Sequence, residues 1–191
     1  MNEEILNFRK KMNEKLINFI YEKLYEKIFP KIQCQQDKKI YKKCIELSWI
    51  ELIHLFENKK YIIHKDFYID IIKYTKQIDL ERAPLKKYNA INKLVNYILN
   101  IIYFNEGNEY SIGKDEITPF LLFAIIKSKP IQMFSNLEYI NLYGGKIDSS
   151  SYNTIFGIVM QLIKEEYKFY NISKEEVKRK CENELSKYYN L

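Results

Sequence analysis

The chain has 191 residues, 47% of them hydrophobic and only 5 glycines and 4 prolines, a composition that allows one good core and argues against a turn-rich β fold. The net charge of +6 is spread along the sequence, which is typical of a lysine-rich solvated surface, with attraction to acidic membrane or nucleic acid as the alternative. Three unpaired cysteines and two histidines make no zinc pattern and indicate reduced thiols. With no apolar run of about 18 residues and a charged N-terminus unlike a signal peptide, we expect a soluble intracellular protein.

The first predicted helix runs from Glu3 to Phe29, where apolar residues recur at three- and four-residue steps, and it ends at Pro30. We expect its apolar face to pack into the core. A second helical stretch begins at Gln35-Gln36-Asp37 and includes Trp49, the only tryptophan. We expect Trp49 to be mostly buried, because an indole ring covers a large apolar area.

A third helix is expected from Asp66, a suitable cap, to about Ile78. The pair Ala83-Pro84 then marks a boundary, and Pro84 suits the first turn of a strongly apolar helix. The glycine-containing segment Asn105 to Gly113 predicts a loop.

This loop leads to Asp115, which opens the most informative stretch of the chain. The residues from Phe120 to Ile125 are almost all apolar, so the helix that carries them should be buried on most sides. Lys127 suits its C-terminus and Pro130 stops it. Asp115 has two interpretations: a cap or first-turn acid favoured by the helix dipole, or a functional carboxylate that a loop presents and the helix holds still.

Three further helices complete the prediction. Ser135 is the expected N-cap of a short helix that ends at Gly144-Gly145. The next helix spans about Tyr152 to Tyr167, with several possible caps from Asp148 to Ser151. Ser173 begins a capping box before a last, charged helix to about Tyr188, whose weak apolar face indicates a peripheral position.

The letters from Asp115 to Ile140 resemble the signature of the Vps-nine (vacuolar protein sorting nine) domain, namely Asp-x-x-x-Pro, an apolar helix, Lys-x-x-Pro and Ser-Asn-Leu-x-Tyr-Ile. Looser matches upstream are Leu24 to Pro30, Asp37, Leu47-x-Trp49 and Pro84-x-x-Lys87. The resemblance implies an all-α fold, a single helical-bundle domain of about seven or eight helices, in agreement with the helix pattern. We expect one domain over residues 1–191, with an N-terminal helical part (1–83), a core that carries the signature (84–170) and a peripheral C-terminal helix (171–191).

The family consists of guanine-nucleotide exchange factors for early-endosomal Rab GTPases of the Rab-five type. The resemblance implies that Asp115 is an acidic finger, which enters the nucleotide site of the Rab and engages its phosphate-loop lysine. A carboxylate there competes for the cation and repels the phosphates. Exchange is not covalent chemistry, so we expect no enzyme in that sense, no metal and no cofactor. The implied setting is cytoplasmic and peripheral on early endosomal membranes.

The resemblance also implies a surface that binds the Rab. Pro119 shapes the start of the helix beside the groove for the switch regions, and Thr154 corresponds to a threonine contact. The family tends to have two adjacent tyrosines where this chain has Ser151-Tyr152, which predicts a weakened or retuned contact. The predicted partner-binding residues are Pro119, Ser135, Asn136, Tyr139, Tyr152 and Thr154. We expect one exposed groove to hold Asp115, Pro119, Tyr152 and Thr154.

Two alternatives stay open. The altered tyrosine position allows a non-catalytic helical module or scaffold that binds a Rab without opening it. The net charge and the many aromatic residues allow a basic nucleic-acid-binding domain, but the basic residues do not cluster, so nucleic acid is not the expected partner. No catalytic triad, metal set or glycine-rich phosphate loop is found in the sequence.

Overall fold

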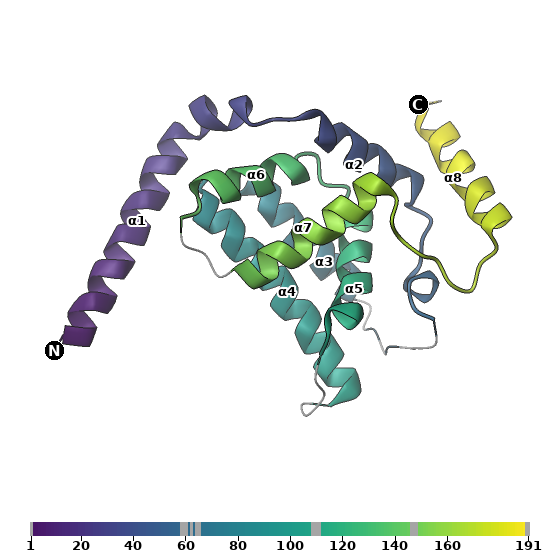
Figure 1. Ribbon diagram of the computed structural model, residues 1–191, viewed down its shortest axis with the longest axis horizontal. Coiled ribbons are helices and arrows are strands. Elements are labelled where there is room, and N and C mark those ends of the chain that lie inside the picture. The colour runs from purple at the N-terminus through teal and green to yellow at the C-terminus, as the bar shows by residue number, and fades with distance from the viewer. Residues whose placement is uncertain are drawn as a thin grey trace.

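The computed structural model describes residues 2–57, 61, 63, 66–107, 112–145 and 149–189. This part of the chain is mostly helical and contains no strand, which confirms the predicted all-α class (Figure 1). The helices are α1 (Asn2–Ile28), α2 (Gln35–Glu46), α3 (Asp66–Leu80), α4 (Pro84–Glu106), α5 (Lys114–Ser128), α6 (Met133–Tyr143), α7 (Ser149–Lys164) and α8 (Lys174–Tyr189). Two short 3-10 turns are η1 (Phe29–Lys31) and η2 (Leu52–His54). Taken one at a time, none of the described helices has the length and hydrophobicity to cross a membrane; α5 from Asp115 and α6 meet the criterion only as a bent pair.

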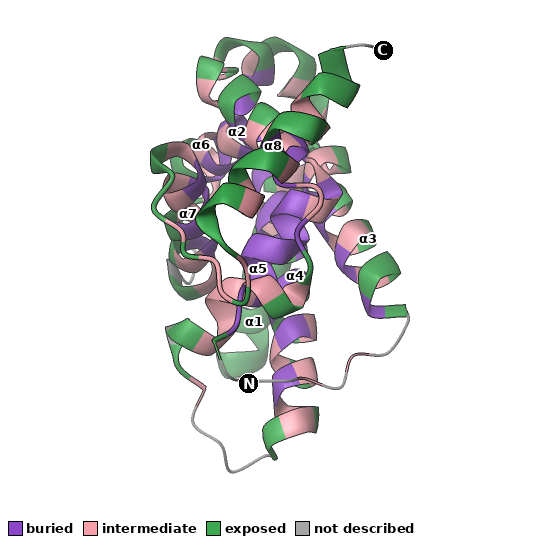
Figure 2. Ribbon diagram, turned by 90° about the vertical axis from the view of Figure 1, so that its right-hand side faces the viewer, coloured by how far each residue is buried: buried purple, intermediate pink, exposed green. Residues whose placement is uncertain are grey.

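Helix α5 lies at the centre of the domain, as predicted. It packs against α2, α3, α4, α7 and η2, and every residue from Phe120 to Ile126 is buried (Figure 2). Lys129 ends the helix in a left-handed conformation, with φ of 48°, and Pro130 prevents its continuation. The first turn of α5 is therefore held by a fully buried segment directly behind it.

The starts of α3 and α4 agree with the sequence pattern. Asp66 lies in the first turn of α3, although the residue before it is outside the described part, so its capping role stays a prediction. Pro84 opens α4 after the N-cap residue Ala83, as expected. Helix α4 continues to Glu106, and residues 108–111 of the predicted loop are outside the described part.

Helix α7 is shifted toward the N-terminus relative to the prediction of Tyr152 to Tyr167. It starts at Ser149 and ends at Lys164, because Glu165 adopts a left-handed conformation with φ of 59°. The proposed cap Asp148 lies outside the described residues.

Asp37 of α2 caps the N-terminus of α6 across the domain. Its Oδ1 accepts hydrogen bonds from the backbone N–H of Phe134 at 2.8 Å and of Ser135 at 3.2 Å, and its Oδ2 accepts one from the Ser135 hydroxyl. The prediction that Ser135 is the N-cap is wrong, since α6 begins at Met133 and its N-cap position is Gln132. A carboxylate at a helix N-terminus satisfies free N–H groups and complements the dipole, so one side chain joins two helices.

Asp79, at the end of α3, makes a second link to α6. Its Oδ1 accepts a hydrogen bond from the Asn136 side-chain amide at 2.6 Å, and its Oδ2 accepts one from the Ile131 N–H at 3.2 Å. Burial raises the pKa of this carboxyl group. Because Asn136 is fully buried, its side-chain amide bonds to Asp79 and is not accessible to a partner.

Lys87 of α4 is completely buried beside the same junction. Its Nζ donates to the Ile78 carbonyl at 2.9 Å and lies 5.4 Å and 5.2 Å from the ring centroids of Tyr25 and Phe29. Burial lowers the pKa of Lys87 to about 8. The lysine of the Pro84-x-x-Lys87 pattern is thus part of the interior, where carbonyls and aromatic rings replace water around the ammonium.

Helix α1 projects from the body of the domain, with its N-terminus at the far end (Figure 1). Its bounds match the prediction, but the expectation that its apolar face packs into the core is wrong. Its aromatic contacts with the body lie in the last third, where Tyr21 and Tyr25 pack edge-on against Tyr139 at centroid distances of 6.3 Å and 5.9 Å. Glu22 pairs with Lys86 at this junction.

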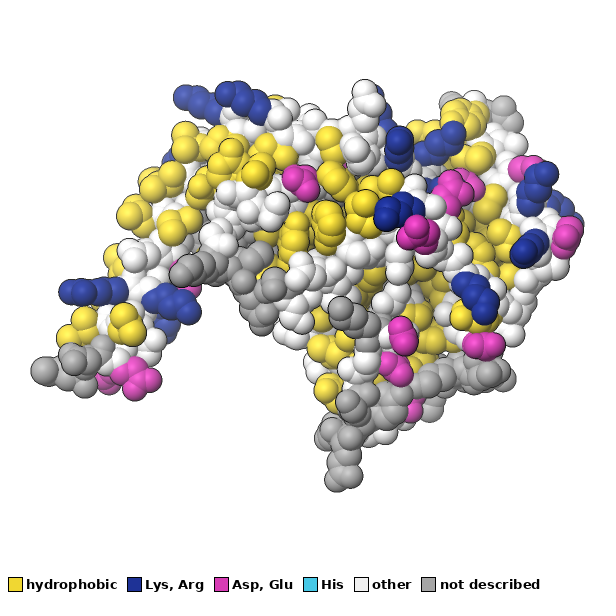
Figure 3. Space-filling view, in the orientation of Figure 1, with side chains coloured by type: hydrophobic (Ala, Val, Ile, Leu, Met, Phe, Trp, Pro, Cys, Tyr) yellow, Lys and Arg dark blue, Asp and Glu magenta, His cyan; other side chains and the backbone are white. Residues whose placement is uncertain are grey.

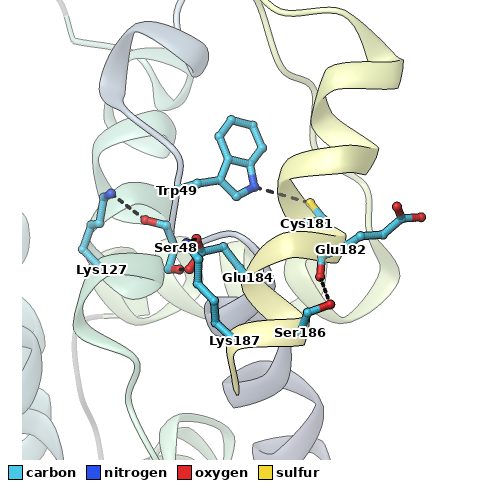
Figure 4. A network of polar contacts seen from close by, with 8 residues as sticks. All are labelled: Ser48, Trp49, Lys127, Cys181, Glu182, Glu184, Ser186 and Lys187. Carbon is cyan, nitrogen blue, oxygen red and sulfur yellow. Dashed lines mark hydrogen bonds and ion pairs between the residues drawn. The ribbon is translucent and has the colours of Figure 1, made fainter. Parts of the chain in front are cut away.

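Helix α8 packs against α2. Figure 4 shows its main contacts: the Trp49 indole N–H donates to Cys181 Sγ at 3.4 Å, and the Ser48 hydroxyl donates to Glu184 at 2.9 Å. Trp49 follows α2 rather than lying in it, and it is partly buried against the edge of the core. Its indole therefore anchors α8 instead of filling the centre of the core. At the start of α8 the predicted Ser173 cap is present, since its hydroxyl accepts a bond from Glu176 N–H at 3.2 Å.

Candidate functional site

A pocket of about 490 Å³ lies beside the first turns of α5. Its walls come from four segments that are distant in the sequence: residues 55–57 after η2, residues 115–122 of α5, Gln161 of α7, and residues 166–170 in the connection from α7 to α8. Asp115 and Pro119 both line it. The structure therefore brings together two of the predicted site residues.

Asp115 is exposed in the first turn of α5, and its carboxylate has no hydrogen-bond or ion-pair partner within the described residues. Glu116 performs the capping that was one interpretation of Asp115. Its carboxylate accepts a bond from the Gly113 N–H at 2.9 Å, which closes the N-terminus of the helix. Asp115 is still a first-turn acid that the helix dipole favours, but its carboxylate faces solvent and does not cap the helix.

Pro119 connects Asp115 to the core. A proline in a helix has no N–H for the carbonyl four residues earlier, so the Asp115 carbonyl lacks its usual partner within α5. The next residue, Phe120, is fully buried and packs edge-on against Phe56 and Phe67 at centroid distances of 5.2 Å and 5.8 Å. A rigid aromatic anchor thus fixes the turn that presents the carboxylate.

The pocket is strongly acidic. Its walls contain four carboxylates, from Glu57, Asp115, Glu116 and Glu166, and one ammonium group, from Lys168. Lys168 Nζ lies 4.8 Å from the ring centroid of Tyr170. The excess negative charge creates a potential that attracts a cationic group. The pocket is therefore suited to a basic side chain. No cluster of three or more metal-ligating side chains occurs in the described part of the chain.

The α7–α8 connection is held in place by bonds to the η2 region. Tyr170 N–H donates to the His54 carbonyl at 2.8 Å, and the Asn171 side-chain amide donates to the Ile53 carbonyl at 2.9 Å. Sequence reasoning missed this wall, including Glu57, which lies next to η2. No local pattern identifies these residues, because their proximity to Asp115 results only from the fold.

Thr154 and Tyr152 do not line the pocket. Thr154 is half-buried and donates to the Ser150 carbonyl at 3.0 Å; it precedes Gln161 by two helical turns, about 10 Å along the same face of α7. Tyr152 lies on the inner face, where its hydroxyl donates to the Leu137 carbonyl at 3.3 Å and burial raises its pKa to about 12. Thr154 therefore lies outside the pocket, on the same face of α7 as the lining residue Gln161. The Tyr152 side chain is mostly buried.

Ser135, Asn136 and Tyr139 have no exposed surface. Ser135 and Asn136 are bonded to Asp37 and Asp79, while Tyr139 packs among the aromatic rings of α1. In this structure these three residues hold α6 in place. They cannot contact a partner directly, and they affect binding only by supporting the surface above them.

Residues 68–168 match the family model of the Vacuolar sorting protein 9 (VPS9) domain. The match covers slightly more than half of the chain, and it includes the α5 and α7 walls of the pocket with Asp115 and Pro119. Residues 55–57 and Tyr170 lie outside it.

The chain is also similar to curated proteins. It is 24% identical over 138 residues to a protein named Rab5 GDP/GTP exchange factor from Bos taurus and to its counterpart from Homo sapiens, covering 70% of this chain and 28% of each relative. It is 25% identical over 134 residues to Vacuolar protein sorting-associated protein 9A from Oryza sativa subsp. japonica, covering 68% of this chain and 28% of that protein. The chain therefore spans less than a third of the length of these relatives.

Proposed function

Because the chain belongs to the VPS9 domain family, we propose that it is a guanine-nucleotide exchange factor for a Rab GTPase, of the Rab5 type, with Asp115 as the acidic finger. Two relatives carry the name Rab5 GDP/GTP exchange factor, which supports the choice of partner. The observation that carries the proposal is the free Asp115 carboxylate at an acidic pocket, left available because Glu116 caps the helix.

The chemistry is electrostatic competition. A GTPase holds its nucleotide with a phosphate-loop lysine, backbone N–H groups and Mg²⁺. Asp115 would neutralise the lysine and repel the phosphates, most strongly once the joined surfaces exclude water. The other carboxylates of the pocket raise the rate of encounter with a basic surface. By linkage, the exchange factor must bind the nucleotide-free GTPase more tightly than the nucleotide-loaded one. The ratio of these two affinities equals the ratio by which the exchange factor weakens nucleotide binding.

The proposed contact surface starts at Asp115 and Pro119 and continues along α7 toward Thr154. Tyr152 contributes chiefly by joining α7 to α6 through its bond to Leu137, and Ser135, Asn136 and Tyr139 support the same region from inside. The proposed setting is the cytoplasmic face of early endosomal membranes, with peripheral association.

The test compares two adjacent acids, Asp115 and Glu116, by rates of fluorescent GDP release from a Rab5-type GTPase and by thermal unfolding. Asp115→Ala and Asp115→Asn are expected to slow release by roughly 30- to 1000-fold, equivalent to about 2–4 kcal/mol, and to leave the fold intact. The matched control Glu116→Ala removes the cap and one other carboxylate of the pocket, so it should cost about 1 kcal/mol of stability and slow release far less than the Asp115 variants do. Near-normal release with both Asp115 variants would refute the acidic finger.

The wild-type measurement separates exchange from simple binding. Tight binding of the GTPase without faster GDP release would refute exchange in favour of a Rab-binding module. That alternative is favoured by the burial of Tyr152, which leaves little tyrosine surface for the partner at this position.

A further inference from the structure

Asn171, in the connection from α7 to α8, fastens this connection to the η2 region. Its side-chain amide donates to the Ile53 carbonyl at 2.9 Å and to the Phe56 carbonyl at 3.3 Å. The neighbouring Tyr170 N–H donates to the His54 carbonyl at 2.8 Å, and Figure 1 shows the connection passing beside η2. The last carbonyls of a helical turn have no partner within it. Residues 170 and 171 supply such partners, and we call them, with the three carbonyls that they bind, the η2 clasp.

The backbone of Asn171 suits this role. Its φ of 58° lies in the left-handed region, which asparagine adopts more readily than most residues do. Asn171 is exposed, so water can replace its amide at the two carbonyls if the side chain is removed. We therefore expect the stability of the fold to depend little on these two bonds.

The η2 clasp lies directly behind the pocket that holds Asp115. Phe56 and Tyr170, which belong to the clasp, are also wall residues of this pocket. The buried Phe56 ring packs against Phe120, with the ring centroids 5.2 Å apart, and Phe120 directly follows the lining residue Pro119. Acidic side chains gather beside the start of α5 on the face shown in Figure 3. The clasp thus holds one wall of the pocket and the ring that supports the opposite wall.

We propose that Asn171 is a positioning residue for nucleotide exchange. It fixes the η2 clasp, and the clasp holds Phe56 against Phe120, behind the turn that presents Asp115. This role rests on the proposed function, because Asp115 is the group that is positioned. Functional groups must be held to within about 0.5 Å of their productive geometry, and a misplacement of about 1 Å can slow a reaction by about 100-fold. Both Asn171 and Phe56 lie outside residues 68–168, the segment that matches the family model.

The test variant is Asn171→Gly, which keeps the left-handed backbone without strain and removes both side-chain bonds. We expect GDP release from a Rab5-type GTPase to slow by about 10-fold or more, while the midpoint of urea unfolding falls by less than about 0.5 M. The matched control is Glu165→Gly. Glu165 lies in the same connection and also has a positive φ, of 59°, but its side chain pairs with Lys43 of α2 at 3.0 Å. The control should release GDP within about twofold of the wild-type rate.

The only tryptophan of the chain reports whether the η2 clasp is closed. The Trp49 ring packs against His54 of η2 and against Phe169 of the connection, at centroid distances of 5.4 Å and 6.0 Å. A loosened clasp should separate these two neighbours and admit water to the indole. We expect Asn171→Gly to shift the Trp49 emission to longer wavelength and to increase its quenching by acrylamide, with neither change in Glu165→Gly. This measurement does not depend on exchange activity.

A second background separates the positioning of Asp115 from a general defect. If Asn171 acts through Asp115, adding Asn171→Gly to Asp115→Ala should slow release by no more than about twofold, because residues that act through one another are not additive. Release from the double variant is measured at high concentration of the exchange factor, so that the residual rate can be followed.

Four results would overturn the positioning role and leave the proposed function intact. These are normal release by Asn171→Gly, slow release with an unchanged Trp49 emission, equal slowing in both backgrounds, and a fall in the urea midpoint large enough to make Asn171 a merely structural residue. A wild-type chain without exchange activity, or normal exchange by Asp115→Ala, would instead refute the proposed function, and the positioning role with it.

Discussion

Removing the Asp37 carboxylate should destabilise the protein far more than the loss of an ordinary helix cap. Asp37→Ala removes the acceptor of three hydrogen bonds, from the Phe134 N–H, the Ser135 N–H and the Ser135 hydroxyl. Asp37 is 7% exposed and Ser135 is fully buried, so water reaches these donors poorly. A buried donor without a partner costs about 1–3 kcal/mol. We therefore expect a loss of about 3–5 kcal/mol, compared with about 1 kcal/mol for an exposed N-cap.

Asp37→Asn separates charge from shape. Its amide oxygen can still accept from the two N–H groups, and its NH₂ can donate to the Ser135 hydroxyl, which already accepts from the Cys34 N–H at 3.1 Å. Only the charge-assisted part of the hydrogen bonds is lost, so we expect Asp37→Asn to lower the free energy of unfolding by about 1–2 kcal/mol.

Urea unfolding followed by circular dichroism measures both variants. The control is Glu182→Ala, an exposed acid on α8, which should change stability by no more than about 0.5 kcal/mol. If Asp37→Ala cost no more than Glu182→Ala, or if Asp37→Asn were as damaging as Asp37→Ala, the account of a buried capping carboxylate would be refuted.

Two further predictions concern titratable groups. Burial lowers the pKa of Lys87 to about 8, so the unfolded chain binds more protons above that pH, and the free energy of unfolding should rise by about 2 kcal/mol between roughly pH 7.5 and 9.5. Urea titrations at several pH values should show this rise in wild type and not in Lys87→Met; equal slopes would contradict it. Burial also raises the pKa of the Cys44 thiol to about 12 and raises that of Cys181. Iodoacetamide should therefore modify the half-exposed Cys34 alone in the native protein, and rapid labelling of Cys44 by mass spectrometry would disprove the buried site.

The helices themselves could be predicted because their signals are local. Apolar periodicity and the stop at Pro130 defined α5, and the pattern around Pro84 defined α4. Burial of α5 also followed from its sequence, since apolar residues on every side of a helix leave no face for water. The same reasoning failed for α1, because an apolar stripe shows that a helix needs a partner and does not show where that partner is.

The candidate site was only half predictable. Asp115 and Pro119 stand four residues apart on one helix, so their proximity was readable from spacing alone. The cap of α6 could not be assigned in this way, because its acceptor, Asp37, lies 98 positions before Ser135. The Glu57 and Lys168 walls of the pocket had no sequence signal either, since loops become neighbours only when the helices between them pack.

The links from Asp37 and Asp79 to α6 also determine which part of the chain can fold alone. The segment that matches the family model begins at residue 68, after α2, and so lacks the acceptor for the first N–H groups of α6. An excised 68–168 fragment would expose those donors together with the face of α6 and α7 that α2 covers. The segment that the family model matches is thus narrower than the folding unit that these contacts require, and we expect that unit to reach back at least to α2.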